Sequence, residues 1–130
     1  MNEKTELLGL LEEAHRRKAR QDLNEYCKMI SIPGAPVADD DDSFYPMNAA
    51  PAAHHRLIND ALMKMEQGRL MRLMIFMPPG SAKSTYATVT APTWFMGKRA
   101  GRNIISASYG SDLAVKFGRK CRSITRSEQY

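Results

Sequence analysis

Apolar residues recur at the three- to four-residue spacing of an amphipathic helix in three stretches of the chain. Residues 4–30 contain enough of this pattern for one or two helices, and residues 52–67 carry a second stripe that ends before Gly68. Residues 111–127 carry the third, with Ser111 placed as its N-cap. The pattern predicts helices near both ends of the chain and one in its middle.

Two further stretches predict strands. Residues 70–77 are almost continuously apolar and are closed by a Pro-Pro-Gly sequence, which is typical of a strand buried on both faces. Residues 102–109 predict a second strand, and residues 82–96 between them predict a helix with a kink at Pro92. Strand, helix, strand and helix in this order predict an α/β fold with a parallel sheet.

Residues 31–53 interrupt both patterns. They are rich in proline and include four consecutive aspartates at 39–42, which predicts a loop. Adjacent carboxylates without a glycine turn do not converge on one ion, so we do not interpret the run as a cation site. The chain divides into an N-terminal helical segment with a Pro- and Asp-rich loop, residues 1–50, and an α/β part, residues 51–130.

Composition and charge narrow the class of protein. A chain of 130 residues with 43% hydrophobic residues and a net charge of +5 suits one domain. The positive charge lies in residues 98–130, which hold 8 basic and 2 acidic residues, whereas residues 1–97 hold 11 and 12. Apolar runs such as residues 73–77 are too short to span a membrane, and the polar start predicts no secretion signal. Cys27 and Cys121 are far apart, which favours a reducing, cytoplasmic setting.

The segment that carries candidate chemistry is residues 77–85, Met-Pro-Pro-Gly-Ser-Ala-Lys-Ser-Thr, between the first predicted strand and its helix. A phosphate chain bound at such a turn needs inward-pointing N–H groups, a lysine for the β- and γ-phosphates and a hydroxyl for Mg²⁺. Lys83 and Ser84 supply the lysine and the hydroxyl. Residues 80–82 supply N–H donors, and the N-terminus of the helix adds its partial positive charge.

This segment departs from the standard GxxxxGK[ST] loop at two positions. Aligned on Lys83, Met77 and Ala82 stand where the pattern has glycines. Gly80, following two prolines, is expected to make the turn that Met77 cannot make cheaply. The alternative interpretation is an ordinary strand-to-helix turn with Lys83 in solvent, and the pattern alone leaves both open.

The same residues resemble the variant phosphate loop of the large terminase subunits of tailed bacteriophages, the ATP-driven motors that package DNA into proheads. The resemblance covers roughly residues 20–130. Its separate motifs occur in the family's order: His54-His55-Arg56-Leu57-Ile58, residues 68–74, Pro78 through Tyr86, Pro92-Thr93-Trp94-Phe95, Gly97-Lys98, residues 104–109 and residues 117–122.

This resemblance implies a P-loop NTPase fold with an additional catalytic strand, of which residues 51–130 would be the N-terminal half. It implies ATP and Mg²⁺ as cofactors, with Lys83 as the catalytic residue at the β- and γ-phosphates, Ser84 as the Mg²⁺ ligand and Thr85 at the α-phosphate. The residues that would surround the nucleotide are Pro79, Gly80, Ser81, Ala82, Lys83, Ser84 and Thr85. The implied partners are double-stranded DNA, the small terminase subunit, the portal protein and further copies of the motor in the host cytoplasm, with no membrane.

The carboxylates needed for hydrolysis are not found after the loop. Hydrolysis requires an acid at the end of a later strand to hold Mg²⁺ and another to position the attacking water. The acids that follow Lys83 are Asp112 and Glu128, both on the last predicted helix. We therefore expect an N-terminal fragment of a motor that binds nucleotide weakly without turnover, and that lacks the family's nuclease domain.

The last predicted helix has a basic face. Its residues Lys116, Arg119, Lys120, Arg122 and Arg126 fall opposite the apolar stripe. One interpretation is a contact with the DNA backbone or a neighbouring subunit, and the other is a solvated helix flank. The alternative function is a non-catalytic nucleic-acid-binding or subunit-interaction module with a degenerate phosphate loop, and a small nucleotide kinase is a third.

Adjacent histidines precede the middle helix. His54 and His55 are poor metal ligands together, because a metal pair on a helix needs spacing of three or four residues. We expect them to pack or to make a polar contact near the nucleotide base.

Overall fold

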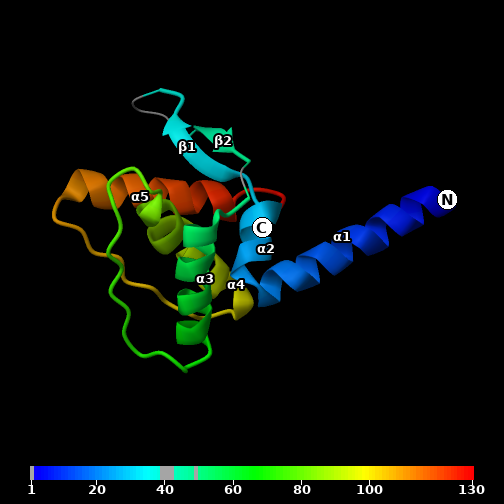
Figure 1. Ribbon diagram of the computed structural model, residues 1–130. Helices are drawn as coiled ribbons and strands as arrows, with labels where there is room; N and C mark the ends of the chain where they lie inside the picture. The colour runs from blue at the N-terminus through cyan, green and yellow to red at the C-terminus, as the bar shows by residue number, and fades with distance from the viewer. Residues whose placement is uncertain (1, 39–42, 49) are drawn as a thin grey trace.

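The computed structural model describes residues 2–38, 43–48 and 50–130. The Asp run predicted as a loop falls on residues 39–42, outside the described residues. No helix in the described part of the chain has the length and apolar character needed to cross a lipid bilayer. The elements, in chain order, are α1 (Glu3–Gln21), α2 (Leu23–Met29), β1 (Ile32–Pro36), β2 (Phe44–Met47), α3 (Ala53–Glu66), η1 (Thr85–Thr90), α4 (Ala91–Lys98) and α5 (Ser111–Thr125) (Figure 1).

The helices predicted from periodicity are present. Helices α1 and α2 occupy the first stretch and are separated by Asp22, whose side-chain oxygen accepts the N–H of Asn24 at 2.8 Å and so caps α2. Helix α3 ends before Gly68, whose φ of +72° is the left-handed conformation expected of a residue after a helix. The N-cap of α5 is Gly110 rather than Ser111, which is already helical.

The predicted parallel sheet is absent from the described residues, so the P-loop fold class is wrong for this structure. Residues 70–77 and 102–109 form no strand ladder, and Figure 1 draws both as irregular traces. Phe76 keeps 83% and Ile105 96% of its surface exposed. A dense apolar run indicates burial, but a strand also needs a backbone partner for its N–H and C=O groups, and the described residues supply none.

The strands that do form lie in the segment predicted as a loop. Strands β1 and β2 pair in antiparallel register, with Ile32 opposite Met47 and Pro33 opposite Pro46. A Cβ atom on Gly34 would come within 2.8 Å of the Tyr45 carbonyl oxygen, so the close approach of the two strands requires glycine. Both strands of a two-stranded sheet are edge strands, and their outward-facing positions need no N–H donor. The prolines of this segment are therefore compatible with strands, and the loop prediction is wrong here.

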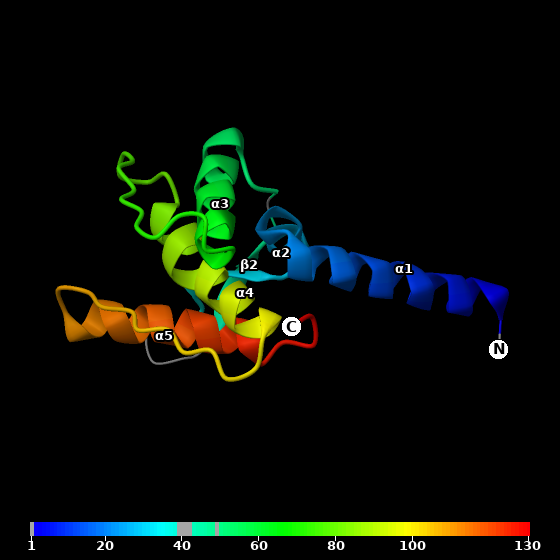
Figure 2. The ribbon, with the colours of Figure 1, turned by 90° about the horizontal axis from the view of Figure 1, so that it is seen from below.

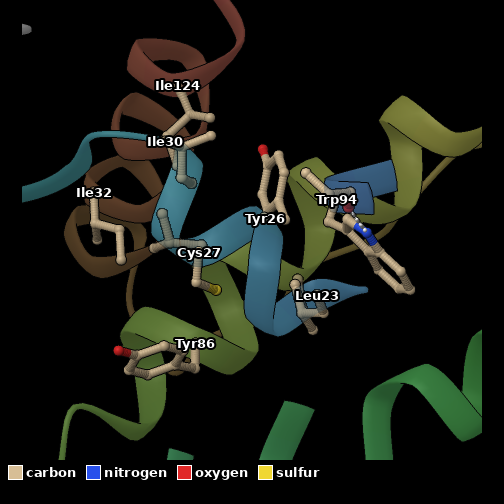
Figure 3. Packing of buried hydrophobic residues seen from close by; sticks show 11 residues of the cluster. Leu23, Tyr26, Cys27, Ile30, Ile32, Tyr86, Trp94 and Ile124 are labelled. Atoms are coloured by element: carbon tan, nitrogen blue, oxygen red, sulfur yellow. Dashed lines mark hydrogen bonds between the residues drawn. The ribbon is translucent and has the colours of Figure 1, made fainter. Parts of the chain in front are cut away.

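A single hydrophobic core joins residues from both halves of the chain. Figure 3 shows its side chains gathered around α2. The indole Nε1 of Trp94 donates to the Ala19 carbonyl at 3.0 Å, and the Tyr26 hydroxyl donates to Thr93 Oγ1 at 2.9 Å. Burial raises the pKa of the Tyr26 hydroxyl, which keeps it protonated. The buried residues are Ala19, Leu23, Tyr26, Cys27, Ile30, Ile32, Tyr86, Val89, Ala91, Trp94 and Ile124.

The helix that runs from Lys83 through Lys98 is widened to π geometry over η1. Pro92 has no N–H to offer the Thr88 carbonyl one turn earlier, and the thiol of Cys121 lies against that carbonyl at 3.6 Å. The Thr90 hydroxyl donates back to the Tyr86 carbonyl at 3.0 Å. The π geometry thus lies in the residues just before Pro92, and the Cys121 contact joins this segment to α5.

A carboxylate at the end of α3 fixes the far end of α4. Lys98 Nζ donates to Glu66 Oε2 at 2.8 Å, and Arg102 Nη1 donates to Glu66 Oε1 at 3.0 Å. Burial alone would raise the pKa of the Glu66 carboxyl, but the hydrogen bonds from Lys98 and Arg102 outweigh it and lower that pKa. Lys98 and Arg102 also lie over the rings of Trp94 and Phe95, respectively.

Glu66→Gln is expected to lower the free energy of unfolding at pH 7 by roughly 1–3 kcal/mol, because two charge-assisted hydrogen bonds are lost. The pKa of Glu66 is lower in the folded chain than its ordinary value of 4.5, so its contribution is complete above pH 4.5. It is lost as pH falls through the folded value. Urea unfolding from pH 7 to pH 3 measures this, and the gap between variant and wild type should narrow with acid.

Glu128→Gln serves as the control, since Glu128 is exposed. Its effect should stay within about 0.5 kcal/mol at every pH. A Glu66→Gln deficit that is unchanged at pH 3 would contradict the electrostatic account.

Candidate functional site

The turn before the long helix is built by proline and glycine. The N–H of Ser81 donates to the Pro78 carbonyl at 3.3 Å, which closes a four-residue turn with Pro79 at its second position. Gly80 at the third position has a φ of +78°. This is the type II arrangement, in which the third residue must be left-handed, so the glycine predicted to make the turn does make it.

Ala82 continues the reversal in a conformation unusual for its side chain. Its φ is +57°, the only left-handed non-glycine residue in the described chain. Such a conformation costs an L-residue about 1–2 kcal/mol. The Ala82 carbonyl accepts the N–H of Tyr86 at 3.3 Å and so starts the helix. Ala82 therefore occupies both the sequence position and a backbone conformation that suit the second glycine of a phosphate loop.

The loop encloses a hollow at the N-terminus of this helix. Residues 77–85 line a concavity of about 320 Å³. Within the described chain, no backbone carbonyl accepts from the N–H groups of residues 83–85. Orphan donors of this kind, together with the helix dipole, favour an anion.

Two side chains of the loop make no polar contact with another described residue. The half-buried Lys83 has no ion pair or hydrogen bond to its ammonium group there. The Ser81 hydroxyl oxygen is buried without a hydrogen-bond partner. The Ser84 residue is exposed and Thr85 is half-buried, both in the first turn of the helix. The structure thus brings together all the loop residues that the sequence nominated.

His55 connects this loop to α3. Its Nδ1 accepts the N–H of Ala52 at 3.1 Å, so Nε2 carries the proton and donates to the Ser81 carbonyl at 2.9 Å. The imidazole also stacks on the Tyr86 ring, with centroids 4.2 Å apart. His55 therefore holds both the turn and the first helical residues. The expected contact with a nucleotide base remains a prediction.

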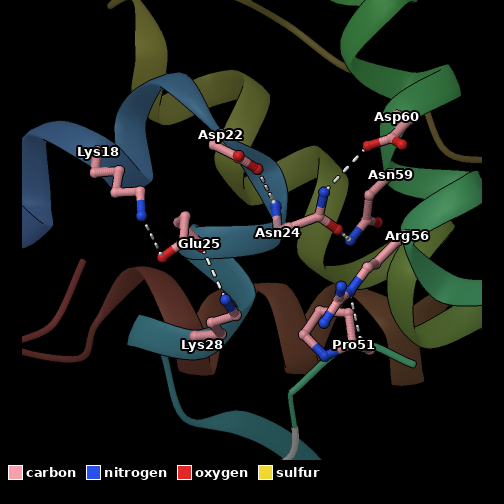
Figure 4. Close-up of polar contacts among 9 residues, drawn as sticks. All are labelled: Lys18, Asp22, Asn24, Glu25, Lys28, Pro51, Arg56, Asn59 and Asp60. Carbon is pink, nitrogen blue, oxygen red and sulfur yellow. Dashed lines mark hydrogen bonds and ion pairs between the residues drawn. The ribbon is translucent and has the colours of Figure 1, made fainter. Parts of the chain in front are cut away.

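The start of α3 is in turn fixed to α2, as Figure 4 shows. Arg56 Nε donates to the Pro51 carbonyl at 3.2 Å, which holds the segment that leads into the helix. The buried Asn59 amide donates to Asn24 Oδ1 at 2.9 Å, and Asn24 Nδ2 donates to Asp60 Oδ1 at 3.1 Å. The position of the loop is thereby set by the core, through α2, α3 and His55.

The donors present suit a phosphate better than a bare metal ion. Ammonium and N–H groups surround the hollow, whereas a cation needs oxygen or other lone-pair ligands. Within the described residues, no group of three or more His, Cys, Asp or Glu side chains converges on one point. The hydroxyl-bearing residues of this loop are Ser81, Ser84 and Thr85, and the Mg²⁺ contact expected of Ser84 remains a prediction.

The basic residues of α5 form a separate surface. Lys116 and Arg126 are exposed, whereas Lys120 is half-buried over the Phe44 ring at 5.8 Å. Burial lowers the pKa of the Lys120 ammonium, and the neighbouring Lys116 lowers it further. Arg119 is half-buried and Arg122 exposed. Lys120 is thus engaged with the hairpin, and the expected DNA or subunit contact of these basic residues remains a prediction.

The two cysteines are both free thiols. Burial raises the pKa of the Cys27 thiol to about 11, so it is an unreactive core residue. The packing and polar contact expected of His55 are present, but sequence reasoning did not identify its acceptor, the Ser81 carbonyl 26 positions away. The position of His55 three residues after Ala52 was the available signal, because the third residue of a helix can bond back to the N-cap N–H.

Comparisons with protein-family models, with curated proteins and with solved structures give no match to this chain. The phosphate-loop interpretation therefore rests on the geometry of residues 77–85 and on the quoted sequence motifs.

His55→Leu is expected to free the loop, because leucine cannot donate to the Ser81 carbonyl. Loss of one hydrogen bond, worth about 1 kcal/mol, corresponds to roughly fivefold faster exchange of the Ser81 and Tyr86 amides, whose N–H groups are hydrogen-bonded in this turn. Hydrogen–deuterium exchange read by mass spectrometry measures this. His55→Gln, whose amide can still donate, should restore part of the protection.

The matched control is His15→Leu, the same change at an exposed position on α1, because His54 contacts the His55 ring. It should leave exchange in the loop unchanged. Equal exchange in wild type and His55→Leu would show that the contact does not hold the loop.

Proposed function

We propose that residues 78–85 bind the triphosphate of ATP with Mg²⁺, and that the chain is the nucleotide-binding part of a phage DNA-packaging ATPase of the large terminase kind. One observation carries the proposal. Gly80 and Ala82 are both left-handed on either side of Ser81 and open a hollow beneath the helix N-terminus. An ordinary strand-to-helix turn has no need of the second, strained residue.

The first residues of the helix, Lys83, Ser84 and Thr85, have the main parts in this binding. Lys83 neutralises the β- and γ-phosphate oxygens, and its lack of an acidic partner within the described residues leaves its charge available. The N–H groups of residues 83–85 donate to phosphate oxygens, supported by the helix dipole. Mg²⁺ supplies charge neutralisation between the phosphates when bound, and Ser84 is the residue that would hold it. Thr85 follows at the α-phosphate.

Binding without turnover is the form of the activity that these residues support. None of the residues lining the hollow is an acid, so none can position an attacking water. ATP hydrolysis, DNA translocation, the small terminase subunit, the portal protein, a homo-oligomeric motor and the host cytoplasm belong to the proposal by resemblance alone.

Mg-ATP is expected to raise the melting temperature of the wild-type chain. At ten times the dissociation constant, binding adds about 1.4 kcal/mol, which corresponds to roughly 5 °C for a chain of this size. Lys83→Ala should abolish most of the rise, because the phosphates lose their ammonium partner. Differential scanning fluorimetry with and without Mg-ATP is the measurement.

Lys64→Ala is the control, since Lys64 is an exposed lysine in the last turn of α3. It makes the same change of charge outside the hollow and should retain the full rise. If wild type shows no rise, or if both lysine variants retain it, the proposed function fails.

The second candidate, a nucleic-acid-binding module, is favoured by the exposed basic residues of α5. Lys116→Ala combined with Arg126→Ala is expected to weaken retention on double-stranded DNA. If both contact phosphates, the slope of log affinity against log salt concentration should fall by about 1.8. Lys4→Ala combined with Lys64→Ala is the control of equal charge, and an identical slope in both double variants would exclude a specific role for α5.

A further inference from the structure

Helix α1 projects from the rest of the described structure with four leucines that are about half-exposed or more. Figures 1 and 2 show its N-terminal part extending well beyond the other elements. The side chains of Leu7, Leu8, Leu10 and Leu11 are 49–60% exposed, whereas Ala19 near the other end is buried. Four exposed leucines within two turns of a helix form an apolar patch, and such patches often mark a site of interaction with another molecule.

These leucines divide into two sides of the helix. At 100° per residue, Leu7, Leu10, Leu11 and Ala14 fall within an arc of about 100°, which we name the leucine face. The centre of the leucine face lies about 130° around the helix from Ala19, which contacts the core. Leu8 lies only about 20° from Ala19. The leucine face therefore points away from the body of the molecule and is open along its length.

The charges of α1 are segregated along its axis. Residues 3–14 hold four acidic residues, Glu3, Glu6, Glu12 and Glu13, against one basic residue, Lys4, whereas residues 15–21 hold Arg16, Arg17, Lys18 and Arg20 and no acid. A second copy of α1 laid antiparallel places acidic residues beside basic ones at both ends. A parallel copy places like charges together, which is unfavourable.

We propose that α1 is a self-association helix, which pairs antiparallel with α1 of a second copy through the leucine face. In the register that suits both features, Leu10 lies opposite the second copy's Leu11, and Leu7 opposite its Ala14. Glu3 then lies opposite Lys18 of the other copy. Lys18 remains 64% exposed beside Glu25, at a distance of 3.5 Å, so it is accessible to this contact.

The size of the contact sets the strength of the pairing. Two helices meeting over about three turns bury less than the roughly 1,200 Å² of a standard interface. We expect a dissociation constant on the order of 10–100 μM, so that the dimer forms reversibly with concentration. This pairing is independent of the phosphate loop and of the proposed function.

Sedimentation velocity of the full chain from about 5 to 500 μM tests the pairing, with circular dichroism to confirm that each variant keeps its helices. The wild type is expected to shift from monomer to dimer. Leu11→Glu should abolish the shift, because it places a charge at the centre of the leucine face. Leu8→Glu is the matched control on the other side of the same helix and should dimerise as wild type does.

The orientation is tested by charge reversal. Lys18→Glu should weaken dimerisation about fivefold or more, and adding Glu3→Lys in the same chain should restore it. A wild-type chain that stays monomeric throughout, as it would if another protein covered this face, overturns the proposal. Equal loss in Leu8→Glu and Leu11→Glu, or no rescue by the double reversal, also overturns it.

Discussion

Burial of the helix from Lys83 to Lys98 is the constraint on which the rest of this structure depends. It contacts α1 through the Trp94 indole, α2 through the Thr93 hydroxyl, and α5 through the Thr88 carbonyl, against which the Cys121 thiol lies. The Tyr130 hydroxyl donates to the Thr93 carbonyl at 3.0 Å and brings the C-terminal turn onto the same helix. Without a sheet at its centre, the molecule uses this one helix to connect elements from both halves of the chain.

The same burial explains how a strained loop is tolerated. Tyr86 and Val89 are held in the core, so the residues just before them cannot relax by moving the helix. His55 fixes the Ser81 carbonyl from the other side, and its ring covers Tyr86. The left-handed Ala82 is thus held between two anchored groups, a situation in which an unfavourable backbone conformation persists.

Sequence reasoning succeeded where the signal is local. Helices α1, α2, α3 and α5 follow from a period that each segment carries by itself, and the turn at Gly80 follows from Pro79 and the need for a left-handed residue. It failed where the outcome depends on a distant partner. Residues 70–77 have the apolar density of a buried strand, but composition does not specify which backbone would pair with it.

The widened turn at η1 and the role of His55 belong to this second kind, because each requires knowing what lies across the interface. Pro92 indicates a disturbed helix from the sequence alone, because proline lacks an N–H for the Thr88 carbonyl. That the Cys121 thiol lies against this carbonyl is known only from the structure. The left-handed Ala82 lies between these cases. The sequence shows that Ala82 stands where a phosphate loop has glycine, one residue before Lys83. Its φ of +57° depends on the contacts of His55 and Tyr86 around it.

Why the loop keeps Ala82 left-handed bears on what it does. A glycine there would remove about 1 kcal/mol of strain in the folded state, but it would also leave the unfolded and unbound loop with more conformations to lose. Alanine, once forced into place by His55 and Tyr86, holds the N–H groups of residues 83–85 around the hollow before any ligand arrives. If the loop binds phosphate as proposed, this preorganisation lowers the ordering entropy that binding costs. The left-handed Ala82 and the His55 hydrogen bond to the Ser81 carbonyl therefore act together to fix the shape of the loop, and the phosphate-binding proposal depends on both.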